Sequence, residues 1–173
     1  MNHLLRGNRR EAAGIFKVNI YIETDNGTKR RVYRGYGAVV EYIRKDGEPV
    51  IRKISGMCYG TWNLAYIQAL TEALKMLTRD CDITLLADND FVCGSISSGR
   101  VREWSLNAWR TVKNEPVENE EAWRELYWKA QEHRHQFHFI HLKEKSPYSK
   151  EIQAAIKEVR EKGQYYQQAE IPS

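Results

Sequence analysis

Hydrophobic and polar residues alternate along the first third of the chain, and this alternation predicts β-strands. Apolar positions recur at every second residue and are β-branched at Val18, Ile20 and Ile22, which is typical of a strand. Asp-Asn-Gly at residues 25–27 and Lys-Asp-Gly at residues 45–47 are turn signals between the alternating segments. We expect strands at residues 16–24, 30–42 and 50–57. Tight turns between them imply an antiparallel meander.

The spacing of apolar residues becomes helical after residue 60. Between Tyr66 and Leu77 they follow the period of an α-helix, and Thr61 is placed to cap it. Residues 82–88 form a nearly continuous apolar run, as expected for a central strand covered on both faces. Asn119 is placed to cap a later helix with Trp123, Leu126, Tyr127 and Ala130 as its buried stripe. Further helices are expected at about residues 89–98 and 101–109, a last strand at residues 136–141, and a final helix from Ser149 to near Gly163.

The resulting order, β-β-β-α-β-α-α-α-β-α, predicts an α/β fold. It implies a mixed five-stranded sheet, with three antiparallel strands followed by two parallel ones and helices on both faces. We expect a single domain at residues 15–163, a loose leader at residues 1–14 and a disordered tail at residues 164–173.

Composition narrows the class of protein. A chain of 173 residues fits one domain with a sizeable core. No apolar run approaches the roughly 18 residues that a membrane span needs, and the start of the chain lacks the apolar core of a secretory signal. Cys58, Cys81 and Cys93 are odd in number and share no metal-ligand spacing, so we expect free thiols in a reducing, cytoplasmic setting and no membrane partner.

Positive charge is concentrated near the start of the chain. Residues 1–60 carry 12 Lys and Arg against 6 Asp and Glu, although the net charge of the whole chain is only +4. The cluster of Lys29, Arg30, Arg31 and Arg34 is a candidate phosphate-binding site. An equally good interpretation is a solvated hairpin edge that charge protects from aggregation.

Five segments resemble the ribonuclease H family, over about residues 16–156. They are VNIYIE at 18–23, GYGAVV at 35–40, NLAYIQALTEALKML at 63–77, ITLLADNDFV at 83–92, and the pattern W-x4-W-R-T-x4-P-V-x-N-x3-W at 104–123. The resemblance implies an enzyme that cleaves the RNA strand of RNA/DNA hybrids. Such enzymes use two metal ions, Mg²⁺ or Mn²⁺, held by four carboxylates, because two close cations stabilise the attacking and leaving oxygens.

The resemblance assigns three of those carboxylates to acids of this chain. Glu23 matches the first, with Asp25 as a substitute on the same strand face, and Asp88 matches the third. Glu151 is the acid nearest to the fourth position. Glu23, Asp88 and Glu151 are therefore the candidate catalytic residues, and Glu23, Asp25 and Asp88 the candidate metal ligands. Glu23 is equally well explained as an ordinary acid at a strand end, and the helix dipole suffices to explain Glu151.

Tyr66 stands where the resemblance requires the second carboxylate, a glutamate. A phenol has a pKa near 10 and is a hydrogen-bond donor at neutral pH, not an anionic ligand. Tyr66 could donate to Asp88 and fill the space of metal and water, or simply pack in the core above Leu70 and Ala73. Glu72 does not replace it, because six helical residues turn a side chain by about 240°.

The tryptophan-rich segment also departs from the family. The resemblance implies several basic residues there that hold the hybrid, but residues 101–123 carry 3 Arg and Lys against 5 Asp and Glu. Because phosphate contacts supply most non-specific affinity, this segment should grip a hybrid poorly. Trp104, Trp109 and Trp123 are better explained as packing anchors.

Together these departures predict a ribonuclease H-fold protein with weak or lost nuclease activity. It would act by binding nucleic acid, such as an RNA/DNA hybrid or another duplex, or a protein partner. The alternative is an active metal-dependent endonuclease that cleaves the RNA strand of hybrids. A third hypothesis is an inhibitor or accessory of a host nucleic-acid enzyme, encoded by a phage or another mobile element.

Histidines are frequent in and before the last predicted strand. His133, His135, His138 and His141 could suggest zinc, but ligands must converge in space. Alternation sends His138 to the face opposite its apolar neighbours, so the four imidazoles are not expected to meet.

Overall fold

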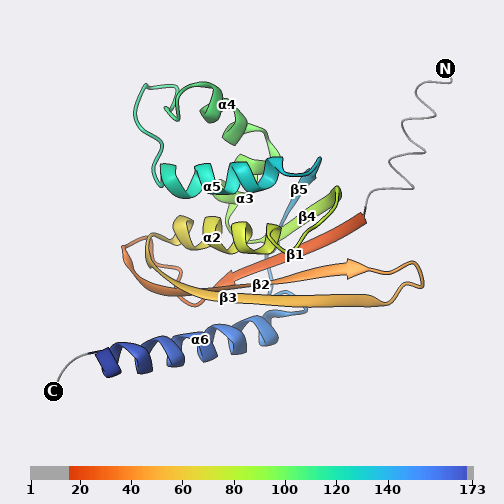
Figure 1. Ribbon diagram of the computed structural model, residues 1–173, viewed down its shortest axis with the longest axis vertical. Helices are drawn as coiled ribbons and strands as arrows, with labels where there is room; N and C mark the ends of the chain where they lie inside the picture. Colours follow the sequence, from red (N-terminus) through yellow and green to blue (C-terminus); the bar gives the residue numbers. More distant parts are fainter. Residues whose placement is uncertain (1–15, 171–173) are drawn as a thin grey trace.

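The computed structural model describes residues 16–170, in which five strands form one mixed sheet (Figure 1). Its order is β3-β2-β1-β4-β5; β1 pairs antiparallel with β2 and parallel with β4. The β2–β3 pair is antiparallel and the β4–β5 pair parallel, so the predicted sheet is confirmed. The strands are β1 (Phe16–Thr24), β2 (Val32–Ile43), β3 (Pro49–Gly60), β4 (Cys81–Ala87) and β5 (Gln136–His141).

Helices cover both faces of this sheet, as the sequence predicts. Helix α6 lies along one face, over β2 and β3, and the other four lie on the opposite side (Figure 1). The helices are α2 (Trp62–Leu74), α3 (Asp90–Ser97), α4 (Arg100–Leu106), α5 (Glu120–Gln131) and α6 (Ser149–Glu170). Within residues 16–170, no helix has both the length and the apolar character needed to cross a membrane.

Side-chain caps explain where two of these helices begin. The Thr61 hydroxyl accepts a hydrogen bond from the Leu64 N–H at 3.3 Å, which confirms the predicted cap of α2. Asn119 precedes α5 as expected, but its side chain does not cap the helix. Its backbone is left-handed (φ 61°), and its amide instead donates to Thr61 at 3.4 Å. A left-handed φ turns the side chain away from the first N–H groups of the helix, which sequence spacing could not reveal.

Two hydrophobic cores hold the layers together. The larger lies between the sheet and α2, α3 and α5, and includes the buried Trp104, Trp109 and Trp123. The smaller lies under α6 and contains Tyr21, Val39, Ile152 and Ile156. Gly35 allows α6 to approach closely, because a Cβ there would lie 2.4 Å from Ile156 Cγ2. Trp104, Trp109 and Trp123 of the tryptophan-rich segment are therefore packing anchors.

The end of α6 differs from the sequence prediction. The helix continues to Glu170 instead of ending near Gly163. The disordered tail at residues 164–173 stays a prediction. Gly163 lies within the helix and not in the left-handed conformation with which many helices end. The predicted leader at residues 1–14, and residues 171–173, lie outside the described residues.

The cysteines are free thiols, as predicted. Cys58, Cys81 and Cys93 are all buried and unpaired by disulfide bonds. Burial raises the pKa of Cys58 and of Cys81 to about 11 and that of Cys93 to about 12. Since the thiolate is the reactive form, these residues are inert packing groups at neutral pH.

Candidate functional site

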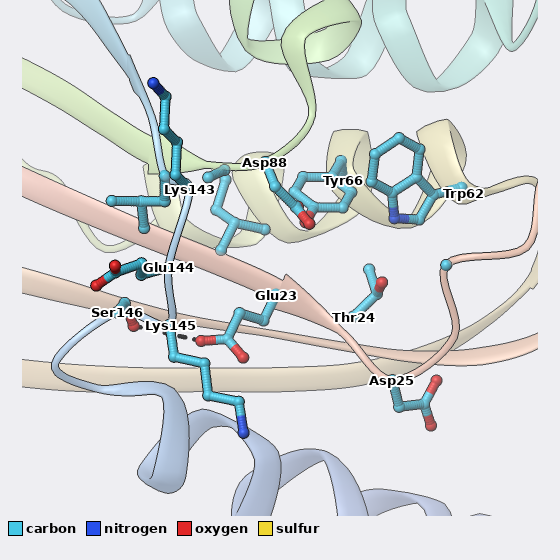
Figure 2. A pocket seen from close by; sticks show the side chains of 14 residues that line it. Glu23, Thr24, Asp25, Trp62, Tyr66, Asp88, Lys143, Glu144, Lys145 and Ser146 are labelled. Atoms are coloured by element: carbon cyan, nitrogen blue, oxygen red, sulfur yellow. Dashed lines mark hydrogen bonds between the residues drawn. The ribbon is translucent and has the colours of Figure 1, made fainter.

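A cleft of about 370 Å³ opens at the carboxyl ends of the parallel strands β1 and β4. Parallel strands of α/β sheets place ligands at this edge. Three side chains from different elements line this cleft (Figure 2). They are Glu23 on β1, Tyr66 on α2 and Asp88, which directly follows β4. The segment between β5 and α6, residues 142–146, forms a further wall. The fold thus brings Glu23, Tyr66 and Asp88 to one site, as the resemblance implies.

The Glu23 carboxylate is held by three neutral donors. Its Oε1 atom accepts from Ser149 Oγ at 2.9 Å and from Gln153 Nε2 at 2.8 Å. Its Oε2 atom accepts from Ser146 Oγ at 3.3 Å. A carboxylate has about four acceptor positions, so these bonds occupy most of its capacity. Glu23 therefore fastens the end of β1 to α6.

Tyr66 makes both contacts that the sequence left open. It is 1% exposed and packs in the core, with its ring edge-on to Trp62 at 5.3 Å between centroids. Its hydroxyl donates a hydrogen bond to Asp88 Oδ1. Burial, reinforced by that bond to Asp88, raises the pKa of Tyr66 far above its usual value. The phenol consequently remains protonated and occupies one oxygen of Asp88.

Asp25 does not act as a second carboxylate beside Glu23. Its Oδ1 atom accepts from the Gly35 N–H at 2.9 Å, and its Oδ2 atom pairs with Arg160 at 2.6 Å. Figure 2 shows the Asp25 carboxylate turned away from Glu23 and Asp88. The predicted substitution fails because Asp25 lies beyond the end of β1, where strand alternation no longer sets its direction.

Glu151, a candidate catalytic residue, is not brought to the cleft, whereas Asp25 lines it. Glu151 lies in the first turn of α6 but does not line the cavity. Gln153 reaches Glu23 instead. Two residues along a helix rotate a side chain by about 200°, so Glu151 and Gln153 cannot face the same way.

Sequence reasoning missed four polar residues of this site. Ser149 and Gln153 stand four residues apart on one face of α6, and this spacing was the available signal. The others are Ser146 and Glu144 in the segment before α6. Figure 2 shows Glu144 directed away from Glu23 and Asp88.

These residues do not fit the pair of metal ions that the resemblance implies. Among residues 16–163, no three His, Cys, Asp or Glu side chains are grouped so as to hold a metal ion. Neutral donors take three of the roughly four acceptor positions of Glu23, and Tyr66 takes one oxygen of Asp88. Two carboxylates, each bonded to protein donors, cannot supply the oxygen-rich shell that two divalent cations need.

The basic cluster near the start of β2 divides into surface and buried members. Lys29, Arg30 and Arg31 are exposed, as phosphate contacts would be. Arg34 is 0% exposed and cannot contact phosphate, which corrects its predicted role. Its guanidinium donates to the carbonyl oxygens of Gly60 at 3.1 Å, Arg30 at 2.5 Å and Asn26. Arg34 is buried because its position on β2 faces the core side of the sheet.

His133 lies 4.0 Å from Asp80 and its ring centroid is 5.4 Å from that of His135, whereas His138 and His141 have separate partners. His138 contacts Asp82 at 2.7 Å, and His141 contacts Asp90 at 2.5 Å. His135 Nδ1 accepts from the Cys81 N–H at 3.1 Å. The expectation that the four imidazoles do not converge is confirmed for this part of the chain.

Comparison with known protein families identifies the RNase H family. A model of the RNase H family matches residues 17–147, three quarters of the chain. Ribonuclease H of Moorella thermoacetica is 36% identical over 110 residues, which are 63% of this chain and 68% of that protein. Ribonuclease H of Chromohalobacter salexigens is 33% identical over 106 residues, 61% of this chain and 62% of that protein. The alignment thus spans less than two thirds of the latter relative.

Solved structures show the same fold at low sequence identity. LC9-RNase H1, described as a type 1 RNase H with the type 2 active-site motif, superposes with a TM-score of 0.64 and 17% identity over 81% of this chain and 70% of that one. The foamy viral protease-reverse transcriptase in complex with RNA/DNA hybrid gives 0.60 and 17%, over 83% of this chain and 19% of that one. At this identity the likeness concerns the fold alone.

Proposed function

This chain belongs to the ribonuclease H family, and from that premise we propose that it binds nucleic acid duplexes while cleaving them weakly or not at all. The observation that carries the proposal is the hydrogen bond from buried Tyr66 to Asp88. A protonated phenol stands at the position where the family resemblance requires an anionic ligand. The proposal concerns RNA/DNA hybrids first, because those are the substrates that the resemblance implies.

Loading this cleft with Mg²⁺ would require breaking bonds that the protein already makes. The Tyr66 hydroxyl is fully buried, so losing Asp88 as its acceptor would leave an unsatisfied donor at a cost of about 1–3 kcal/mol. Glu23 would likewise have to release Ser149 and Gln153, which hold α6 on the sheet. Both costs oppose metal binding.

The exposed cations Lys29, Arg30 and Arg31 support duplex binding. They lie on the loop that borders the cleft at Gly27. Each phosphate contact releases counterions and makes the affinity dependent on salt.

We expect the salt dependence of hybrid binding to identify this loop as the phosphate contact. Changing Lys29, Arg30 and Arg31 together to Gln should flatten the slope of log K against log[salt] by about 2.7, since each contact contributes about 0.9. Fluorescence anisotropy with a blunt hybrid at several salt concentrations measures this slope. Arg52→Gln with Lys53→Gln is the matched control, because both side chains are exposed farther along β3. An unchanged slope in the triple variant would remove the loop from the interface.

The alternative function is metal-dependent cleavage of the RNA strand in hybrids. The relatives are named ribonuclease H, and those names favour this alternative over loss of activity. Asp88 and Glu23 border one cleft, which also supports it. Cleavage would then require the Tyr66–Asp88 bond to open when metal and substrate bind.

A cleavage assay separates the two functions. Purified protein is incubated with a labelled RNA/DNA hybrid in Mg²⁺ and in Mn²⁺, beside Asp88→Asn. We expect no cleavage above the rate of the Asp88→Asn protein in either metal, while both proteins still bind the blunt hybrid. Metal-dependent cleavage by the wild type that disappears in Asp88→Asn would refute the proposal and establish the nuclease.

A further inference from the structure

Two exposed tyrosines stand side by side where β2 begins and β3 ends. Tyr33 is 57% exposed and Tyr59 is 58% exposed, although both are large aromatic residues in regular strands. They face each other in the β2–β3 register, with ring centroids 5.1 Å apart and planes at 61°. Neither the core nor the cleft uses these rings. They form a rigid aromatic surface open to solvent, which we call the tyrosine pair.

Positive charge adjoins the tyrosine pair directly. Arg31 lies two residues before Tyr33, and Arg30 and Lys29 precede it on the same loop; all three are exposed. The nearest carboxylate on that loop, Asp25, is already paired with Arg160. The cations are therefore available to an anionic ligand.

Arg34 holds the loop and the tyrosine pair in a fixed relation. Its guanidinium donates to Asn26 and Arg30 in the loop and to Gly60, the residue after Tyr59. One buried side chain thus ties the basic loop to the end of β3. Arg160 adds a bond to the Tyr33 carbonyl at 3.4 Å. The surface is organised before any ligand arrives, which lowers the entropic cost of binding.

We propose that the tyrosine pair and the loop cations form a binding site for single-stranded nucleic acid, adjoining the duplex site of the proposed function on which this inference rests. Unpaired bases stack on Tyr33 and Tyr59, while Lys29, Arg30 and Arg31 contact the phosphates. The ligand is a single strand because bases inside a duplex have both faces covered and cannot stack on a protein ring. Aromatic rings next to cations are the combination that binds single strands without sequence preference.

The experiment compares a blunt RNA/DNA hybrid with the same hybrid carrying a single-stranded extension of about ten nucleotides, within the usual size of such sites. Fluorescence anisotropy gives both affinities for the wild type, Tyr33→Ala/Tyr59→Ala and Tyr33→Phe/Tyr59→Phe. We expect the extension to increase wild-type affinity by about 25-fold or more, since each of the two stacked bases contributes roughly fivefold or more. The alanine variant should lose this gain yet bind the blunt hybrid within about twofold, and the phenylalanine variant should keep it because stacking needs no hydroxyl.

Controls separate the site from general surface effects. Trp128→Ala removes another exposed aromatic residue, 64% exposed on α5, and should leave the gain unchanged. A gain that survives Tyr33→Ala/Tyr59→Ala, or no gain in the wild type, would overturn the inference while blunt-hybrid binding keeps the proposed function intact. If the protein binds neither probe, both the single-strand site and the proposed duplex binding are overturned. The tyrosine pair would then be a candidate surface for a protein partner.

Discussion

Replacing Arg34 with methionine is expected to lower the free energy of unfolding by about 2–4 kcal/mol, because three backbone carbonyls lose a buried donor and each costs about 1 kcal/mol or more. These carbonyls belong to Asn26, Arg30 and Gly60. Methionine preserves much of the apolar stem, so the loss reports the guanidinium and not a cavity. Burial lowers the pKa of Arg34, yet an arginine remains charged at neutral pH.

Urea denaturation of Arg34→Met beside Arg30→Met measures the effect. Arg30 is an exposed neighbour, so its replacement should change stability by less than about 0.5 kcal/mol. The Arg34 variant should also lose binding to the extended hybrid more strongly than Arg30→Met, since the loop and Tyr59 are no longer tied together. Equal stability of the two variants would show that water can hydrogen-bond the three carbonyls in place of Arg34. The Arg34 guanidinium would then not stabilise the contact between the loop and β3.

Replacing Tyr66 with glutamate is expected to produce a protein that divalent metal stabilises. Without metal, a buried carboxyl beside Asp88 should cost about 2–4 kcal/mol, because it removes core packing and adds a like charge. Mg²⁺ or Mn²⁺ at a hundred times its dissociation constant should raise the free energy of unfolding of the Tyr66→Glu variant by about 2.7 kcal/mol. In a chain of this size, that free energy corresponds to a rise in Tm on the order of 5–10 °C.

Thermal unfolding of Tyr66→Glu, Tyr66→Gln and the wild type, with and without metal, measures the change. Glutamine has nearly the same shape but no charge, so only the glutamate variant should respond to metal. A metal-induced rise in the wild-type Tm would contradict our conclusion that the present side chains do not fit metal. If Tyr66→Glu also cleaves hybrid, the wild-type cleft is one residue from catalysis.

The periodicity of apolar residues along the chain determined most of the fold. Alternating segments separated by Asp-Asn-Gly and Lys-Asp-Gly predict the meander, and helical spacing after Thr61 predicts α2. These signals are local, because strand and helix periods and turn residues depend on neighbours in the chain. The end of α6 was predicted wrongly because Gly163 is tolerated inside a helix and marks its end only when it adopts a left-handed conformation.

The candidate site was predictable where the family resemblance fixes the position of a residue. Asp88 after β4 and Tyr66 on α2 lie where the resemblance places them, and a hydrogen bond joins the two side chains. The structure does not support the predicted roles of Asp25 and Glu151. Asp25 lies beyond the last residue of β1, and Glu151 lies on a different face of α6 from Gln153. No local pattern states which way such a side chain turns.

What the sequence alone determined is the order of elements, the family resemblance and the tyrosine at position 66, where that resemblance requires an acid. Only the tertiary structure decided how each charge is used, because burial and hydrogen bonding depend on contacts between residues far apart in the chain. It joined Glu23 to Gln153, 130 residues away, and withdrew Arg34 from the surface while leaving Lys29, Arg30 and Arg31 exposed. The four basic residues look alike in the sequence. On β2, however, the Arg34 side chain points toward the core, whereas Lys29, Arg30 and Arg31 precede the strand and remain exposed to solvent.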